Sequence, residues 1–262
     1  MAQENEKQMP SCELHRHLKQ KYFQMKIALL GYGKMGQAIE QIALQKGHEI
    51  VLRINDQNLD DLTKENIQQA DVAIEFTNPQ SAVENILFCL NENVPIVCGT
   101  TGWLSQLKMV EEKCKELNGT FLCASNFSIG VNIFFELNKK LASLMKGHSD
   151  YNVNLEEIHH TEKKDAPSGT AITLAEGILA TLEDKAKWVN HETQQADELS
   201  IISKRIENFP GTHSIKYSSD IDDIEIIHTA HSRKGFAQGA VLAAEFIVNK
   251  KGIFTMKDVL NF

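Results

Sequence analysis

Short apolar runs alternate with amphipathic segments through the first half of the chain, and this alternation constrains the fold more than any other feature. The apolar runs predict strands at residues 27–30, 49–54, 72–76, 95–98 and 121–124. Apolar side chains at helical spacing predict helices at residues 37–46, 81–91 and 104–117. Strands joined through helices pair in parallel by right-handed crossovers. We therefore predict an α/β fold with a parallel sheet.

A glycine-rich turn links the first predicted strand to the first predicted helix. It fits the pattern G-x-G-x-x-G with Gly31, Tyr32, Gly33, Lys34, Met35 and Gly36. The glycines permit a tight turn and let a pyrophosphate approach the helix N-terminus. The strand and helix on either side favour a dinucleotide site over a turn without a ligand.

Charged residues near the second predicted strand bear on which dinucleotide binds. Asp56, with Asn55 beside it, stands where such sites carry an acid for the ribose hydroxyls, roughly 20 residues after the glycines. It can also be a solvated loop acid. Arg53 and Lys34 can attract a 2′-phosphate instead. The sequence thus predicts NADH or NADPH and leaves the choice between them open.

Two further loops follow predicted strands and carry small or hydroxyl side chains. The first contains Gly99, Thr100 and Thr101, and the second contains Cys123, Ala124, Ser125 and Asn126. Ligands bind at the carboxyl ends of the strands in open parallel sheets. We expect these loops to seat the nicotinamide ribose, although each can also be a plain turn.

The pattern changes after residue 126. Helices are predicted at residues 131–146, 168–182 and 236–249, and β-like runs at 151–159, 200–206, 215–219 and 223–231. Strands with polar alternation suit a mixed or antiparallel open sheet. We predict a dinucleotide-binding domain at 25–126, a smaller α+β substrate domain at 127–232, and a C-terminal segment at 233–262 that returns to the first domain. Residues 1–24 are polar, resemble no secretory signal and are expected to lie outside the core.

Composition excludes several classes of protein. Hydrophobic residues make up 42% of the 262 residues, which suffices for a packed core. The net charge of −8 argues against a nucleic-acid coat or a membrane-surface role. No apolar run reaches the roughly 18 residues of a membrane span. The cysteines form no C-x-x-C pair, which predicts reduced thiols in the cytoplasm; they are Cys12, Cys89, Cys98, Cys114 and Cys123.

Two adjacent histidines and a lysine form the strongest candidate for chemistry. His159 and His160 end a predicted strand, so their side chains point to opposite faces and cannot share one task. Histidine exchanges a proton near neutral pH, and the Lys163 ammonium can stabilise negative charge that develops on a substrate. Lys163 and Lys164 can also form a solvated charge pair.

The helix that follows begins with a possible anion cradle. Ser168, Gly169 and Thr170 combine free backbone N–H groups with two hydroxyls, which suits a carboxylate. The alternative is an ordinary serine N-cap. No set of His, Cys and Glu has metal-ligand spacing on one element, so no metal is predicted.

These motifs together resemble the dihydrodipicolinate reductase family, whose members are also named 4-hydroxy-tetrahydrodipicolinate reductases. The resemblance runs from Met25 to the C-terminus and rests on residues 31–36, 75–79, 99–102, 126–132, 159–171 and 233–240. The segment from His159 to Ala171 is its most specific part.

The resemblance implies a Rossmann-like domain, a smaller domain that builds a homotetramer, and a cytoplasmic enzyme of diaminopimelate and lysine biosynthesis that uses NADH or NADPH. It implies His159 as acid/base, Lys163 as proton donor, and a dicarboxylate substrate held by His160, Ser168, Gly169 and Thr170. The sequence departs from the family between Asp56 and Asp71, which is short, and at Asn55-Asp56, where an acid and an arginine are expected. Both departures bear on cofactor preference.

Two other functions are compatible with the glycine turn. Another two-domain nicotinamide dehydrogenase would share residues 31–36 but not the segment from His159 to Ala171. A non-catalytic nucleotide sensor would need neither Lys163 nor the carboxylate cradle.

Overall fold

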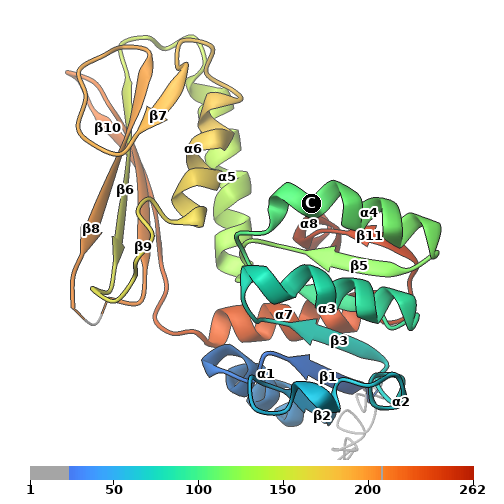
Figure 1. The fold of residues 1–262 in the computed structure, drawn as a ribbon. Coiled ribbons are helices and arrows are strands. Elements are labelled where there is room, and N and C mark those ends of the chain that lie inside the picture. The colour runs from blue at the N-terminus through green and yellow to red at the C-terminus, as the bar shows by residue number, and fades with distance from the viewer. Residues whose placement is uncertain (1–23, 208) are drawn as a thin grey trace, which may run out of the picture.

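A computed structural model describes residues 24–207 and 209–262, and it contains two β-sheets (Figure 1). The first sheet has six strands in the order β11-β5-β4-β3-β1-β2, all paired in parallel. They are β1 (Lys26–Leu30), β2 (Glu49–Ile54), β3 (Val72–Glu75), β4 (Ile96–Cys98), β5 (Thr120–Cys123) and β11 (Gly252–Phe254). The predicted parallel sheet is confirmed. The predicted N-terminal extension lies, apart from Gln24, outside the described residues.

Helices cover both faces of the first sheet. The cluster on one face draws on α1 (Lys34–Gln45), α7 (Lys234–Ile247) and α8 (Met256–Leu260). The cluster on the other draws on α3 (Pro79–Asn91) and α4 (Leu107–Glu116). Strands buried on both faces are continuously apolar, and β1 and β3 are buried at almost every position for this reason. Three short helices, η1 (Leu59–Asp61), α2 (Lys64–Ile67) and η2 (Leu104–Gln106), lie in the connections.

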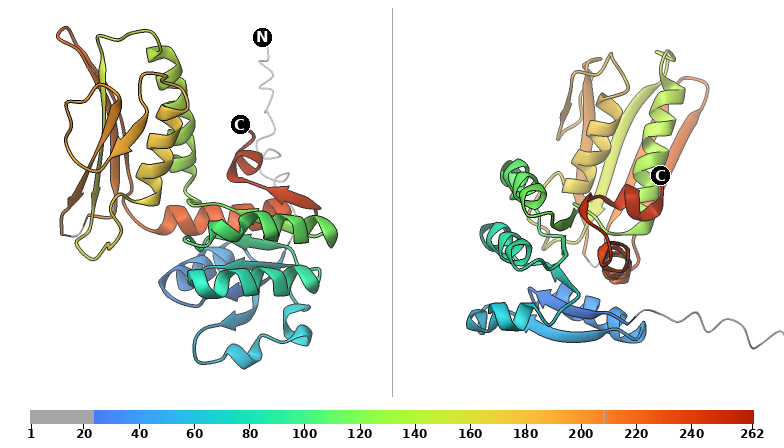
Figure 2. Two further views of the ribbon diagram at one scale, coloured as in Figure 1. Left: turned by 45° about the horizontal axis from the view of Figure 1, so that its top comes forward. Right: turned by 90° about the vertical axis from the view of Figure 1, so that its right-hand side faces the viewer.

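The second sheet stands beside the first and is mixed (Figure 1). Its order is β10-β9-β6-β8-β7, with β6, β8 and β7 mutually parallel and β9 antiparallel to both β6 and β10. The strands are β6 (Asn152–His159), β7 (Lys187–Val189), β8 (Glu198–Arg205), β9 (Thr212–Ser218) and β10 (Asp223–Thr229). Helices α5 (Ile129–Met145) and α6 (Gly169–Leu179) cover one face, as both views in Figure 2 show. The predicted mixed sheet is confirmed.

Strand β8 departs from the predicted alternation. Glu198, Leu199, Ser200 and Ile201 are all buried in succession. The chain after β7 covers the outer face here, because the Ser200 hydroxyl donates to the His191 carbonyl at 2.7 Å. Both faces of the start of β8 are therefore removed from water.

The C-terminal segment returns to the first sheet. Helix α7 packs against α1, and β11 pairs with β5. Strands β7 and β11 and helices α2 and α8 were not predicted from the sequence, since elements of three to five residues show no clear period. Among the described residues, no helix combines the length and apolarity that crossing a membrane requires.

Candidate active site

The glycine turn between β1 and α1 has the geometry of a dinucleotide site. Gly31 has φ +98°, and a Cβ there would lie 2.0 Å from the Phe76 carbonyl oxygen. A Cβ at Gly36 would lie 2.3 Å from the Gly31 carbonyl oxygen, so loop and helix touch. A Cβ at Gly33 would meet nothing within 4 Å. The open space in front of the α1 N-terminus therefore fits a pyrophosphate.

A cavity of about 320 Å³ extends from this turn toward the end of β2. Its lining includes Gly31, Tyr32, Gly33, Asn55 and the exposed Asp56. The structure thus brings Asp56 beside the glycine turn, which is the position predicted for a residue that accepts from the ribose hydroxyls.

Arg53 is paired with an acid. Its Nε donates to Glu40 at 3.0 Å, and the Tyr32 hydroxyl donates to the same carboxylate. The Arg53 hydrogen bond holds the pKa of Glu40 below its usual range, against the effect of burial. Glu40 therefore competes with a 2′-phosphate for Arg53, whereas Lys34 stays exposed.

A second cavity of about 580 Å³ joins the glycine turn to the loop after β4. It is lined by Gly33, Lys34, Met35, Gly99, Thr100 and Thr101, and also by Phe76 and Arg233. Two predicted cofactor-binding segments therefore meet. Sequence reasoning did not name Arg233 as a site residue, because it lies far along the chain at the start of α7.

The loop after β5 occupies a different position. Cys123, Ala124, Ser125 and Asn126 line a separate cavity of about 270 Å³ that no residue of the glycine turn reaches. Asn126 nevertheless links the two halves of the site, because its Nδ2 donates to the Thr170 hydroxyl at 3.2 Å. The first sheet is thereby tied to the start of α6.

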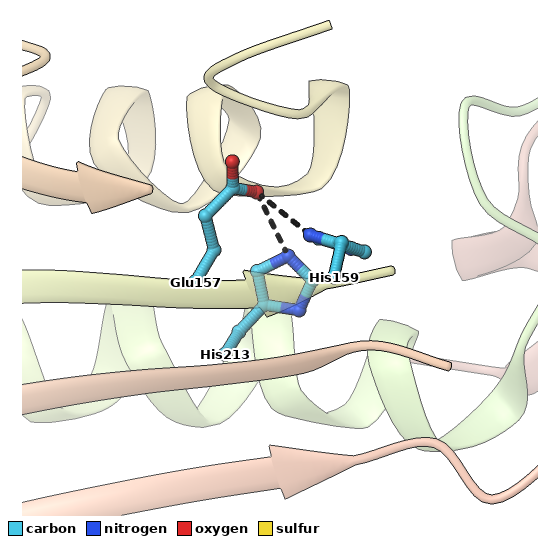
Figure 3. Close-up of side chains that lie close together, drawn as sticks. All are labelled: Glu157, His159 and His213. Carbon is cyan, nitrogen blue, oxygen red and sulfur yellow. Dashed lines mark ion pairs between the residues drawn. The ribbon is translucent and has the colours of Figure 1, made fainter. Parts of the chain in front are cut away.

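His159 and His160 point in different directions from the end of β6. His159 is buried beside Glu157 and His213 (Figure 3), with its Nδ1 3.3 Å from the Glu157 carboxylate. His160 lines a cavity of about 440 Å³ that also contains Arg233. Because Arg233 lines both this cavity and the cavity of about 580 Å³ at the glycine turn, the two cavities are neighbours.

Burial and nearby positive charge make His159 a weak base. Desolvation, then the charges of His213, Lys163 and Arg205, lower the pKa of His159 to about 4, although Glu157 opposes them. The imidazole is consequently neutral at pH 7.

Lys163 lies on the loop after β6 and is paired with an acid. Its Nζ donates to both oxygens of Asp165 at 2.8 and 2.9 Å. Its charge acts on His159, since it contributes to lowering the pKa of that ring. Lys164 is exposed.

Ser168 begins α6 as an N-cap. Its side-chain oxygen accepts from the Ala171 N–H at 3.2 Å, and the residue is buried. The Ser168 side chain is therefore an ordinary helix N-cap, which was the alternative to an anion-binding role. Gly169 is exposed and Thr170 half-buried, and their N–H groups belong to the first turn, where no intrahelical acceptor exists. Those two N–H groups remain suited to an anion.

Glu157, His159 and His213 also lie close enough together to hold a metal ion, with one ligand atom from each within 4.8 Å of the others. The sequence argument considered only sets on one element and missed this cluster, which two strands assemble. The Glu157 carboxylate already accepts from the Ser168 N–H, the Ser203 hydroxyl and Arg205. A guanidinium at 3.3 Å disfavours a second cation, so we describe Glu157 as the acceptor of a hydrogen-bond network rather than as a metal ligand.

Solved structures share this fold. A dipicolinate-bound dihydrodipicolinate reductase from Paenisporosarcina sp. TG-14 superposes with a TM-score of 0.70 at 24% identity, covering 89% of this chain and 98% of that one. An amine dehydrogenase from Mycobacterium smegmatis gives a TM-score of 0.60 at 11% identity, covering 89% of this chain and 95% of that one.

Sequence relatives are closer. A 4-hydroxy-tetrahydrodipicolinate reductase of Christiangramia forsetii is 52% identical, covering 90% of this chain and 98% of the relative. One from Alkaliphilus oremlandii is 34% identical, covering 87% and 95%. The model of the dihydrodipicolinate reductase N-terminus matches residues 25–127, and that of the C-terminus matches residues 130–260. The chain belongs to the dihydrodipicolinate reductase family.

Proposed function

We propose that this protein reduces 4-hydroxy-tetrahydrodipicolinate to tetrahydrodipicolinate with loss of water, in diaminopimelate and lysine biosynthesis. The observation that carries the proposal is the junction at Arg233, which lines both the glycine-turn cavity and the cavity containing His160. The cavity at the glycine turn is thus a neighbour of the cavity that His160 lines, and we propose that the first holds the cofactor and the second admits the substrate. This is the arrangement that a reductase of a small dianion needs.

The glycine turn and the loop after β4 would hold the cofactor. Gly31, Gly33 and Gly36 leave room for the pyrophosphate, and Asp56 would accept from the ribose hydroxyls. When bound, the reduced nicotinamide supplies a hydride to the unsaturated ring of the substrate. Thr100 and Thr101, with Asn126 from the next loop, are the polar groups proposed for the nicotinamide ribose.

Proton movements fall to His159 and Lys163. His159 is neutral at pH 7, so its ring has an unprotonated nitrogen that would take the ring proton that leaves as water is lost. Lys163 is the charged donor, and it would return a proton to the same ring carbon once reduction has left an enamine. A positioned proton donor accelerates such steps by roughly 10²–10⁴-fold.

The start of α6 would bind a substrate carboxylate. The free N–H groups of Gly169 and Thr170 carry the positive end of the helix dipole. His160 faces the adjoining cavity and would approach the substrate from the other side. Ser168 would contribute chiefly by capping this turn.

NADH is the proposed preferred cofactor. Asp56 repels a 2′-phosphate, and Glu40 neutralises the nearby Arg53. Lys34 remains exposed at the glycine turn, which leaves NADPH as a poorer alternative.

We also retain the proposed division into a dinucleotide-binding domain at 25–126, a substrate domain at 127–232 and a returning segment at 233–262. We propose a cytoplasmic homotetramer built through the second domain. Exposed apolar side chains on α5 and β10 support such an interface; they are Ile133, Leu137, Leu144 and Ile227.

A coupled assay tests the activity. Pyruvate, aspartate semialdehyde and the upstream synthase generate the substrate in place, and NADH absorbance is followed. Absorbance should fall only when all three are present. Consumption of NADH with simple ketones instead, and none with the coupled system, would assign the protein to another class of dehydrogenase.

A further inference from the structure

The buried carboxylate of Glu157 lies between the proton-handling residues and the carboxylate cradle. Its side chain has no exposed surface. Both of its oxygens accept from the Ser168 N–H at 3.1 Å, and Oε2 lies 3.3 Å from His159 Nδ1 (Figure 3). One carboxylate therefore contacts the start of α6 and the catalytic imidazole together.

The register of the second sheet explains this position. Glu157 and His159 are two residues apart on β6 and so share a face. Glu157 is paired across the sheet with His213 on β9 and with Ser203 on β8. The Ser203 hydroxyl donates to Glu157 at 2.8 Å, and His213 Nε2 lies 3.6 Å from Glu157 and 3.2 Å from the Ser168 hydroxyl. Three strands thus converge on one charge.

Arg205 extends the network to Lys163. It is the β8 partner of His159. Its Nη2 lies 3.3 Å from Glu157, and its Nε donates to the Lys163 carbonyl oxygen at 3.3 Å. The backbone that carries the proposed proton donor is therefore held by the same cluster.

The cluster keeps Glu157 ionised. Burial raises the pKa of Glu157, but hydrogen bonds from His213, Ser168 and Ser203 outweigh it and hold the pKa well below its usual range. A buried, ionised carboxylate holds its hydrogen-bond donors in place. If one donor moved away, part of the buried charge would be left without a partner, which costs free energy.

We propose that Glu157 is a positioning residue for the reaction, supported by His213. It acts by orienting the His159 imidazole and by holding the start of α6 and, through Arg205, the loop of Lys163. This proposal rests on the proposed function, since it concerns the same site. Because its side chain has no exposed surface, Glu157 itself would touch neither cofactor nor substrate.

Glu157→Gln tests the proposal because it removes the charge and keeps the shape. The kcat should fall by about 100-fold, the effect of a small misplacement of reacting groups. The inhibition constant of pyridine-2,6-dicarboxylate should rise about tenfold as the cradle loosens. The dissociation constant of NADH should stay within about twofold, since the glycine turn is untouched.

Glu156→Gln is the matched control. Glu156 is the preceding residue on the opposite face of β6, paired with Lys204 at 2.5 Å near the surface. It should leave all three quantities within about twofold of the wild type. Thermal melting of each variant gives the folded fraction, so that activity is expressed per folded molecule.

Equal behaviour of the two variants would overturn the proposal. So would a Glu157→Gln variant that loses NADH affinity along with kcat, because Glu157 would then only maintain the fold. If Glu157→Gln does not fold, His213→Gln is measured instead, and an unchanged inhibition constant overturns the proposal. Absence of turnover in the wild type would refute the proposed function alone, and calorimetric binding of the dicarboxylate would still test Glu157.

Discussion

Each of the two sheets carries a glutamate without exposed surface at the carboxyl end of a strand, but the two glutamates have different partners. Glu75 on β3 accepts from the Thr77 N–H at 2.9 Å, the Thr100 hydroxyl at 3.0 Å and the Cys98 thiol at 2.9 Å. These donors are all neutral. Glu157 on β6 is surrounded instead by Arg205 and two histidines.

The difference matches what each region must do. In the first sheet, Glu75 joins the loop after β3 to the loop after β4, both of which line the cofactor cavity. We propose that these loops bind the cofactor through glycines and backbone N–H groups. Neutral hydrogen-bond donors to Glu75 suffice to fix such a backbone. In the second sheet the carboxylate lies beside His159, which we propose exchanges a proton with the substrate. We expect changes in the first region to affect cofactor binding, and changes in the second to affect substrate binding and turnover.

The largest expected effect is that of Lys163→Ala. Lys163 is the proposed proton donor, so kcat should fall by about 100-fold or more when its ammonium is removed. NADH affinity, measured by fluorescence titration, should change only a few-fold. Lys164→Ala is the control and should be mild. Equal losses in both variants would mean that the lysines form only a charge patch.

The pKa of His159 predicts a loss of stability in mild acid. A folded pKa of about 4 against an ordinary 6.5 means that the unfolded chain binds the proton more readily between these values. The effect of His159 on the free energy of unfolding is therefore absent above pH 6.5. Below that pH the free energy of unfolding decreases, by about 2 kcal/mol between pH 7 and pH 5. Glu157 causes a further loss of stability only below pH 4.5, its ordinary pKa, because its pKa is lowered in the folded protein.

Urea unfolding at pH 7 and pH 5 measures this effect. His159→Gln should lose less stability than the wild type over the same interval, which separates His159 from the other titrating groups. An identical loss in the two proteins would contradict the assignment.

Glu75→Gln tests the first region directly. One neutral donor loses its acceptor, which costs about 1–3 kcal/mol locally, so NADH should bind about tenfold more weakly. The inhibition constant of pyridine-2,6-dicarboxylate should be unchanged in the absence of nucleotide. If Glu75→Gln and Glu157→Gln alter the same quantity, the division between the two regions is wrong.

Thr170→Val tests the cradle in the second region. It keeps the shape and removes a hydroxyl that also accepts from Asn126. Pyridine-2,6-dicarboxylate should compete with substrate and not with NADH, and the change should weaken it by about 1–2 kcal/mol. Inhibition constants for the two proteins decide the matter. Agreement within error would mean that Thr170 only links α6 to the first sheet.

The fold was more predictable from sequence than the site. Apart from Lys26 and Glu75 at their ends, the strands β1, β3 and β4 are apolar because both of their faces are buried, and such runs are plain in a sequence. The edge strands β7 and β11 have three residues each and lie half exposed, so neither period nor composition marks them.

The site was only partly predictable because its network is assembled by strand pairing. His159 and Lys163 stand close in sequence, so one short segment predicts both of them. His213 lies on another strand and reaches Glu157 only through the β6–β9 register. One signal was present: Glu157 precedes His159 by two residues and therefore shares its face. Likewise, the pairing of Arg53 with Glu40 required knowing that β2 lies against α1.

The smallest expected effect concerns that last pair. Glu40→Gln frees the Arg53 guanidinium while keeping an acceptor oxygen for the Tyr32 hydroxyl, and a freed guanidinium near the cavity should improve NADPH binding about threefold by charge attraction. NADH binding should not change, because NADH has no 2′-phosphate. Adding Arg53→Ala to Glu40→Gln should cancel the gain. Asp56→Ala should also shift the ratio toward NADPH, but independently of Arg53, since it removes repulsion and frees no cation. If the two single changes are not additive, Asp56 and Arg53 act on the same phosphate position; if neither moves the ratio, Lys34 at the glycine turn sets the preference.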